Sequence, residues 1–122
     1  MQDKNFLSNK TINLIDYYKE IFKNANCIIN ITYELDAITY LLKKPSCTKY
    51  WSAWLTSPTL IQRNYIKKIE KIKPKYILYE PRGVYFDGLE LYQRIELINN
   101  YLMSGYKKYN EVGNFIILKK NE

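Results

Sequence analysis

The chain has 122 residues, a formal net charge of +7 and no histidine. Its length is that of one domain, and 47% hydrophobic with 16% aromatic residues predicts a packed core rather than a disordered chain. The lack of histidine excludes Ser-His-Asp and Cys-His catalysis, histidine ligation of a metal and a histidine pH switch.

Helical and strand-like segments alternate along the first half of the chain. Apolar residues recur at helical spacing from Asn9 to Lys23, which predicts an amphipathic helix. The β-branched run Cys27–Thr32 predicts a buried strand. Thr32 also caps a second predicted helix, which ends at Pro45, and Cys47–Trp51 then predicts a second strand.

The second half continues this alternation and ends in a hairpin. A third helix is predicted to begin at Ser57-Pro58 and to end at Pro74, followed by a strand at Lys75–Glu80. A fourth helix ends at Gly105. Gly113-Asn114 forms the expected turn between the hairpin strands Lys108–Val112 and Phe115–Lys119.

The order of these elements predicts a single α/β domain over residues 1–122. Right-handed crossovers would place helices on both faces of a mostly parallel sheet, so the expected class is a three-layer Rossmann-like sandwich with a C-terminal antiparallel hairpin. Neither GxGxxG nor GxxxxGK[ST] occurs in the sequence, so neither dinucleotide nor P-loop nucleotide binding is expected, and no cofactor is assigned.

Two segments at the expected carboxyl ends of the strands are rich in aromatic and charged residues. Ligands of open α/β sheets bind at that edge, so these segments are a candidate cleft for a sugar or a planar ring. The alternative, which we favour, is that both tryptophans pack as core over the sheet edge. Glu80 and Asp87 could in principle serve as the carboxylate pair that glycoside hydrolysis needs. Two acids in one loop are common in proteins, however, so no catalytic residue is assigned. The candidate ligand-binding residues are Trp51, Trp54, Glu80, Arg82, Tyr85 and Asp87.

A cluster of lysines surrounds the end of the third helix. Its members, as candidate contacts to an anionic membrane surface, are Lys67, Lys68, Lys71, Lys73 and Lys75. The alternative is an ordinary solvated helix face. Lysine outnumbers arginine sixteen to three, and lysine is poorly suited to bidentate recognition of bases, so nucleic acid is not the favoured partner.

The two cysteines, Cys27 and Cys47, leave two interpretations open. Two ligands are too few for a zinc site, and no metal site is assigned. The default is a pair of buried free thiols. The alternative is a disulfide between the two predicted neighbouring strands, which an oxidising compartment would permit.

Several of these segments together resemble a known family. The resemblance begins at about Tyr17 and rests on loosely spaced apolar and aromatic positions, in the runs Cys27–Ile29, Ala37–Leu42, Cys47–Trp51, Gln62–Ile72, Lys73–Glu80, Ile98–Tyr101 and Gly113–Lys119. The pattern is similar to that of polytopic bacterial membrane proteins of the GT-C, mannosyltransferase-like glycosyltransferase type. Those proteins use lipid-linked sugars and carry an α/β domain outside the cytoplasm, after their last transmembrane helix.

The resemblance implies a non-catalytic, soluble extracytoplasmic domain at the periplasmic face of the inner membrane. Its implied partners are the transmembrane part of the same protein, an anionic membrane surface, and a glycan or lipid-linked sugar. The catalytic acid of that family lies in a membrane portion that is absent here, so no catalytic residue is carried over to this chain. No stretch of the sequence reaches the ~20 apolar residues that a bilayer span needs. The alternative is a free-standing cytoplasmic module that binds nucleic acid or another polyanion. The sequence predicts no oligomeric state.

Overall fold

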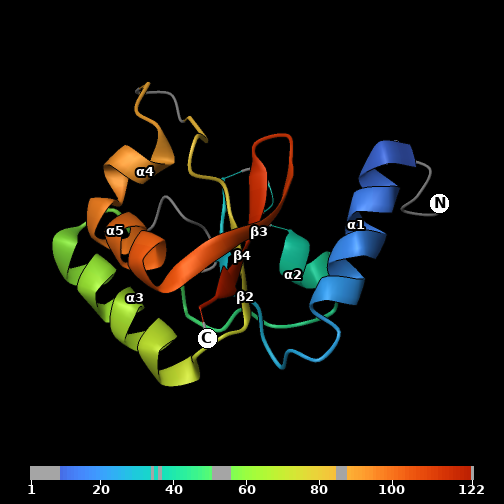
Figure 1. Ribbon diagram of the computed structural model, residues 1–122, viewed down its shortest axis with the longest axis horizontal. Coiled ribbons are helices and arrows are strands. Elements are labelled where there is room, and N and C mark those ends of the chain that lie inside the picture. Colours follow the sequence, from blue (N-terminus) through green and yellow to red (C-terminus); the bar gives the residue numbers. More distant parts are fainter. Residues whose placement is uncertain (1–8, 34, 36, 51–55, 85–87, 122) are drawn as a thin grey trace.

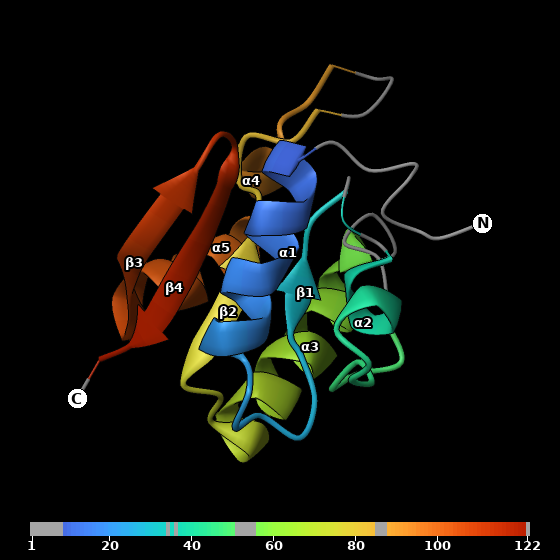
Figure 2. The ribbon, with the colours of Figure 1, turned by 90° about the vertical axis from the view of Figure 1, so that its right-hand side faces the viewer.

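The computed structural model describes residues 9–33, 35, 37–50, 56–84 and 88–121. Within them, a sheet of four strands lies between two groups of helices (Figures 1 and 2). The elements are α1 (Asn9–Ile21), β1 (Asn30–Ile31), α2 (Ile38–Leu41), α3 (Thr59–Ile72), β2 (Tyr76–Tyr79), α4 (Leu91–Arg94), α5 (Glu96–Gly105), β3 (Tyr106–Val112) and β4 (Phe115–Lys120). Helices α3, α4 and α5 lie on one side of the sheet, and α1 and α2 on the other.

The sheet is mixed, with the order β1-β2-β4-β3. β1 runs parallel to β2, whereas β2–β4 and β4–β3 are antiparallel. The predicted class, a three-layer Rossmann-like sandwich with a mostly parallel sheet, is therefore wrong. The C-terminal hairpin is present, but β4 inserts beside β2. The run Phe115–Leu118 is apolar at every position, as a strand covered on both faces requires, and this explains the central place of β4.

The strand predicted at Cys47–Trp51 is absent from its described part, residues 47–50. Directly before this segment, Ser46 forms an isolated parallel bridge with Ile28. After it, the Ser46 side-chain oxygen accepts a hydrogen bond from the Thr48 N–H at 3.2 Å, and the Thr48 hydroxyl oxygen accepts one from the Tyr50 N–H at 3.0 Å. Such local side-chain bonds compete with a strand ladder, so this segment folds as a turn and a second parallel neighbour for β1 is lost.

The predicted helices agree with the structure where the ends carry strong local signals. α1 and α3 lie as predicted, and the C-cap of α3 is Lys73, which takes a left-handed φ of 52° before Pro74. The second helix shrinks to α2, ended by Lys43 at φ 56°. The fourth splits at Ile95, whose φ of −117° and ψ of 52° are not helical, into α4 and α5.

Each face of the sheet has its own apolar core. Ile77, Tyr79 and Leu118 face α3, α4 and α5, whereas Leu78 and Ile117 face α1 and α2. All five side chains are buried, in the period-two alternation of a strand. β2 and β4 are therefore covered on both faces, while the side chains of edge strand β3 are mostly exposed.

Candidate functional site

The cleft predicted at the carboxyl ends of the strands is described only in part. Trp51, Trp54, Tyr85 and Asp87 lie outside the described residues. Glu80, directly after β2, and Arg82 are described. The cleft as a whole remains a prediction, and the two described residues have different environments.

Glu80 is buried, and its described hydrogen bond connects two segments of the backbone. Its side chain is 0% exposed, and its Oε1 accepts a hydrogen bond of 2.8 Å from the Tyr33 N–H. The bond joins the chain just beyond β1 to the chain just beyond β2. Gly83 lies against it so closely that a Cβ atom there would be 2.9 Å from Glu80 Cδ. Glu80 thus holds the two strand ends together beneath a tight turn.

Arg82 lies on the surface of the same turn. Its side chain is 75% exposed, and its Nη1 is 3.8 Å from Glu90 Oε1. Glu90 also begins α4 through a reciprocal capping box with Gln93. An exposed ion pair of this length contributes about 0–1 kcal/mol, so this contact does little to fix the guanidinium.

The five predicted membrane-facing lysines are all exposed, but they do not all border the same part of the surface. Lys67, Lys68 and Lys71 belong to α3, and Lys73 ends that helix. Lys68 lines a cavity of about 340 Å³ beside Tyr50 and Tyr65. The fifth, Lys75, lies beyond Pro74 and lines a different and larger cavity. Contact with an anionic surface remains a prediction.

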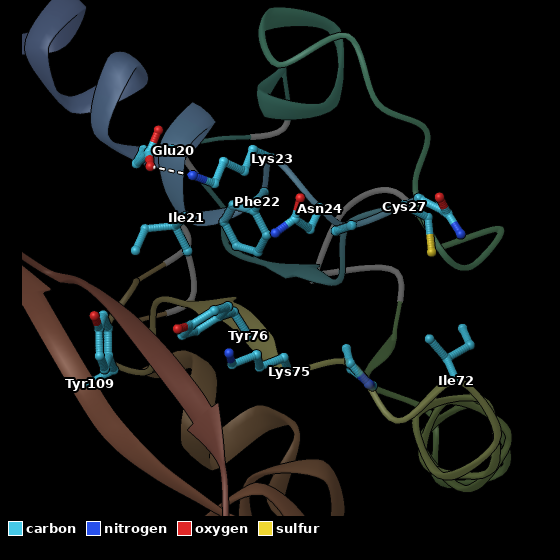
Figure 3. A pocket seen from close by; sticks show the side chains of 13 residues that line it. Glu20, Ile21, Phe22, Lys23, Asn24, Cys27, Ile72, Lys75, Tyr76 and Tyr109 are labelled. Atoms are coloured by element: carbon cyan, nitrogen blue, oxygen red, sulfur yellow. Dashed lines mark hydrogen bonds and ion pairs between the residues drawn. The ribbon is translucent and has the colours of Figure 1, made fainter.

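This larger cavity was not predicted from the sequence. It has a volume of about 680 Å³ and lies between the end of α1 with the following loop, the segment Ile72–Tyr76, and Tyr109 of β3 (Figure 3). The volume is within the roughly 300–1,000 Å³ of small-molecule sites. Asn110 donates a hydrogen bond of 2.6 Å to the Tyr17 hydroxyl, which fixes β3 against α1 beside the cavity.

Two tyrosines and one lysine give one wall of this cavity its chemistry. The rings of Tyr76 and Tyr109 contact each other, with centroids 5.3 Å apart and planes at 58°. The Lys75 ammonium is 5.5 Å from the Tyr76 ring centroid, and the Lys119 ammonium is 5.6 Å from that of Tyr109. We name the three lining residues Lys75, Tyr76 and Tyr109 the Tyr/Lys wall, and Lys119 lies beside it at the Tyr109 ring. Cations at aromatic faces are held by the ring quadrupole.

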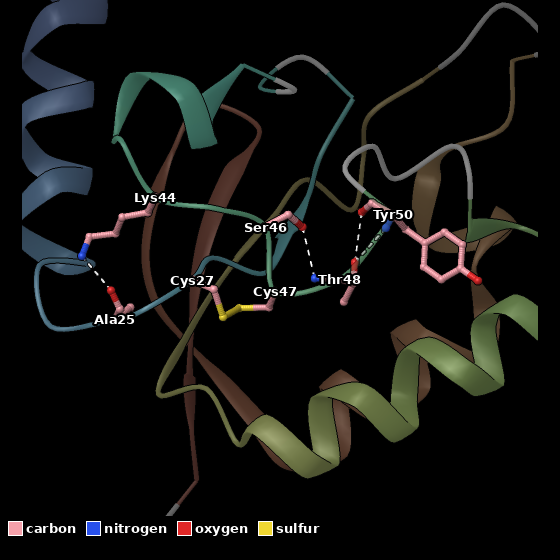
Figure 4. Close-up of a disulfide and its surroundings, with 7 residues drawn as sticks. All are labelled: Ala25, Cys27, Lys44, Ser46, Cys47, Thr48 and Tyr50. Carbon is pink, nitrogen blue, oxygen red and sulfur yellow. Dashed lines mark hydrogen bonds between the residues drawn. A yellow bond between two sulfur atoms is a disulfide. The ribbon is translucent and has the colours of Figure 1, made fainter.

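The opposite side of the cavity is the loop between α1 and β1. Lys23 pairs with Glu20 at 2.7 Å, and Lys44 donates a bond of 2.6 Å to the Ala25 carbonyl (Figures 3 and 4). Cys27 lies in this loop and also lines the cavity. The loop is thus tied to the chain that follows α2.

Cys27 and Cys47 form a disulfide, with Cα atoms 4.9 Å apart (Figure 4). The default interpretation of two buried thiols is therefore wrong, and the alternative holds. The Ile28–Ser46 bridge explains it, because the Cys47 N–H donates to the Ile28 carbonyl at 2.9 Å and brings the two cysteines side by side. The bond lies between the two cavities, since Cys27 lines the larger and Cys47 the smaller.

The sequence held only a faint signal for the Tyr/Lys wall. Lysine precedes tyrosine at Lys75-Tyr76 and again at Lys108-Tyr109, which suggests aromatic and cationic groups together. Tyr76 pairs with Lys119 across the sheet because of the register between β2 and β4. The sequence does not specify that register.

Comparison with models of protein families, with curated proteins and with solved structures finds no match. None of the described helices is long and apolar enough to cross a membrane. The described residues also contain no cluster of three or more Cys, Asp or Glu side chains that could hold a metal ion. The geometry above therefore carries the functional argument.

Proposed function

We propose that this chain is a non-catalytic binding domain that works outside the cytoplasm, as an accessory part of a membrane glycosyltransferase-like protein. The observation that carries the proposal is the Cys27–Cys47 disulfide. Disulfides persist in oxidising compartments and are rare in the cytosol of mesophiles. The bond closes a loop over a sequence separation of 20 and fixes a wall of the larger cavity, so it supports both the compartment and a binding role.

The membrane partnership rests on the sequence resemblance and on charge. The exposed lysines Lys67, Lys68 and Lys71 lie along α3, and each lysine held near an anionic membrane adds about 1 kcal/mol of attraction. In this proposal the α3 side turns toward lipid head groups, and the larger cavity remains open to a ligand. The role assigned to the domain is binding, because catalysis belongs to a membrane portion in the family it resembles.

Fractionation of cells that make the native protein tests the proposal. An antibody against this domain is used to follow it, after thiols are trapped by rapid alkylation. We expect the domain in the membrane fraction, reached by added protease from the outer side, with Cys27 and Cys47 protected from alkylation. A Cys47→Ser variant is the control, because its Cys27 must become reactive. A cytosolic protein with both thiols alkylated would refute the proposal.

A second candidate, binding of a polyanion such as nucleic acid, is favoured by one observation on the hairpin. Lys107 and Lys119 are direct cross-strand partners, although like charges in that position repel. With Lys120 and Asn121 they line a polar hollow of about 460 Å³. Binding to DNA that weakens steeply with salt and is lost in Lys107→Gln, in a protein found in the cytosol, would favour this candidate.

A further inference from the structure

We infer that the larger cavity binds a small anionic sugar, that is, a monosaccharide carrying a phosphate or carboxylate group. The ring lies on Tyr76 and Tyr109, and the anionic group lies at Lys75. The inference stands apart from the proposed compartment and membrane partnership, because it concerns only what the cavity recognises.

The tyrosine pair determines the shape of the ligand. The two rings contact each other at 58°, so they form one bent apolar surface rather than a slot with parallel walls. A flat nucleobase stacks on one ring plane and leaves the other uncovered. A puckered sugar ring has C–H groups at different angles, and it therefore covers both rings at once. Tyr109 is 49% exposed, so its face is accessible to a ligand.

The lysines determine the charge of the ligand. Among the described residues, neither Lys75 nor Lys119 forms an ion pair, and each ammonium lies over a tyrosine ring instead. They flank the tyrosine pair, one at each ring, and of the two lysines only Lys75 lines the cavity. Lys23, by contrast, is paired with Glu20 at 2.7 Å. The Tyr/Lys wall therefore presents the Lys75 cation beside an apolar surface, which matches an anionic group attached to a sugar ring.

Amide side chains complete the site. Asn24 and Asn26, in the loop after α1, line the opposite side of the cavity and are exposed. An amide both donates and accepts hydrogen bonds, as does a sugar hydroxyl, so these residues can satisfy hydroxyls that point away from the Tyr/Lys wall. Cys27 lines the same cavity, so the disulfide helps to hold this loop over the site.

Titration of the isotope-labelled chain, followed by NMR, tests the inference. The probes are glucose 1-phosphate, glucuronate, glucose and inorganic phosphate. We expect saturable changes in chemical shift at Tyr76, Tyr109 and the Asn24–Cys27 loop with at least one of the two anionic sugars. Comparing glucose 1-phosphate with glucuronate shows whether the site prefers a phosphate or a carboxylate group. Lys75→Gln should weaken that binding by about tenfold or more, because a charged contact is lost. Tyr109→Leu should weaken it as well.

Two exposed residues outside the cavity provide matched controls. Lys108→Gln and Tyr40→Leu should leave binding unchanged, and thermal unfolding of all four variants checks that each is folded. The inference is overturned if glucose or inorganic phosphate binds as tightly as the anionic sugars, if the shifts lie away from the Tyr/Lys wall, or if nothing saturates at roughly 10 mM ligand. None of these results bears on where the protein resides in the cell, so failure here is distinct from failure of the proposed function.

Discussion

The side-chain oxygen of Gln62 accepts a hydrogen bond of 2.9 Å from the backbone N–H of Leu97. The same oxygen accepts a second bond, of 3.3 Å, from Ile98, and the Gln62 amide nitrogen donates one of 2.7 Å to the Ser57 carbonyl. Gln62 is 5% exposed. The first N–H groups of a helix have no partner within it, so Gln62 of α3 caps the start of α5 and joins the two helices.

Replacing this buried amide should destabilise the fold. In Gln62→Met the volume is nearly kept, but the N–H groups of Leu97 and Ile98 lose their described acceptor. We expect a loss of about 2 kcal/mol in the free energy of unfolding, measured with urea, because buried polar groups are left without partners. The exposed neighbour provides the control, and Arg63→Met should change stability by less than about 0.5 kcal/mol. Equal effects of the two substitutions would contradict the capping role.

Local signals in the sequence predicted part of this fold. Pro74 marks the end of α3, and the apolar repeat marks α1, because helix formation depends on residues a few positions apart. Strand order depends on distant residues. The fully apolar Ile116-Ile117-Leu118 run indicates a doubly covered strand, but nothing local says that it pairs with β2. The prediction of a mostly parallel sheet was wrong because the antiparallel pairing of β4 with β2 was not foreseen.

The candidate site was hard to predict for the same reason. Lys23, Lys75 and Tyr109 are far apart in the chain and meet only through the packing of α1 beside β2 and β3. The Cys27–Cys47 disulfide likewise depends on one bridge, between Ile28 and Ser46, in a segment where the sequence predicted a full strand. Residue types indicated the available chemistry, but the register determined which groups meet.

Gly83 should tolerate no side chain. A Cβ atom there would be 2.9 Å from Glu80 Cδ and 3.1 Å from Tyr33 Cδ2, in a buried turn. We expect Gly83→Ala to cost about 1–3 kcal/mol of unfolding free energy, as overpacking does. Gly105 of α5 is the matched control, because a Cβ atom there would have nothing within 4 Å, and Gly105→Ala should stabilise the helix by roughly 0.5–1 kcal/mol. Loss of stability only in Gly105→Ala would contradict this packing.

The disulfide should contribute strongly to stability. It joins residues separated by 20 positions, and a loop of that size is expected to add about 3 kcal/mol by restricting the unfolded chain. Denaturation with and without a reductant measures this contribution. The Cys27→Ala/Cys47→Ala double variant is the control, and it should be less stable than the oxidised protein but insensitive to reductant. A wild-type protein that loses no stability on reduction would show that the bond contributes little.

The buried tyrosines should make the fold sensitive to alkali. Burial, with a smaller contribution from Tyr17, raises the pKa of Tyr18 from 10.0 to about 12. Burial, with a smaller contribution from Tyr101, raises the pKa of Tyr106 to about 12 as well. Burial also raises the pKa of Tyr79, whose hydroxyl donates a 2.7 Å hydrogen bond to Asn99.

The sign of the effect follows from these shifts. The folded state holds each phenolic proton more tightly than the unfolded state, whose tyrosines titrate near pH 10. The stability that this contributes is fully present below about pH 10 and is lost as the pH rises from there through the folded pKa, about 12 for Tyr18 and Tyr106. We therefore expect the free energy of unfolding to fall steadily over this interval, followed by urea denaturation at several pH values.

Spectrophotometric titration of the phenolates provides a second measurement. The buried tyrosines should ionise only as the chain unfolds, so that phenolate absorbance and loss of circular dichroism rise together in the last phase of the titration. Tyr18→Phe removes one late phenol and should flatten the fall of stability with pH. Tyr40→Phe alters a side chain that is 76% exposed and should leave that fall unchanged. If all thirteen tyrosines ionised in one reversible step with the fold intact, the buried positions of Tyr18, Tyr79 and Tyr106 would be wrong.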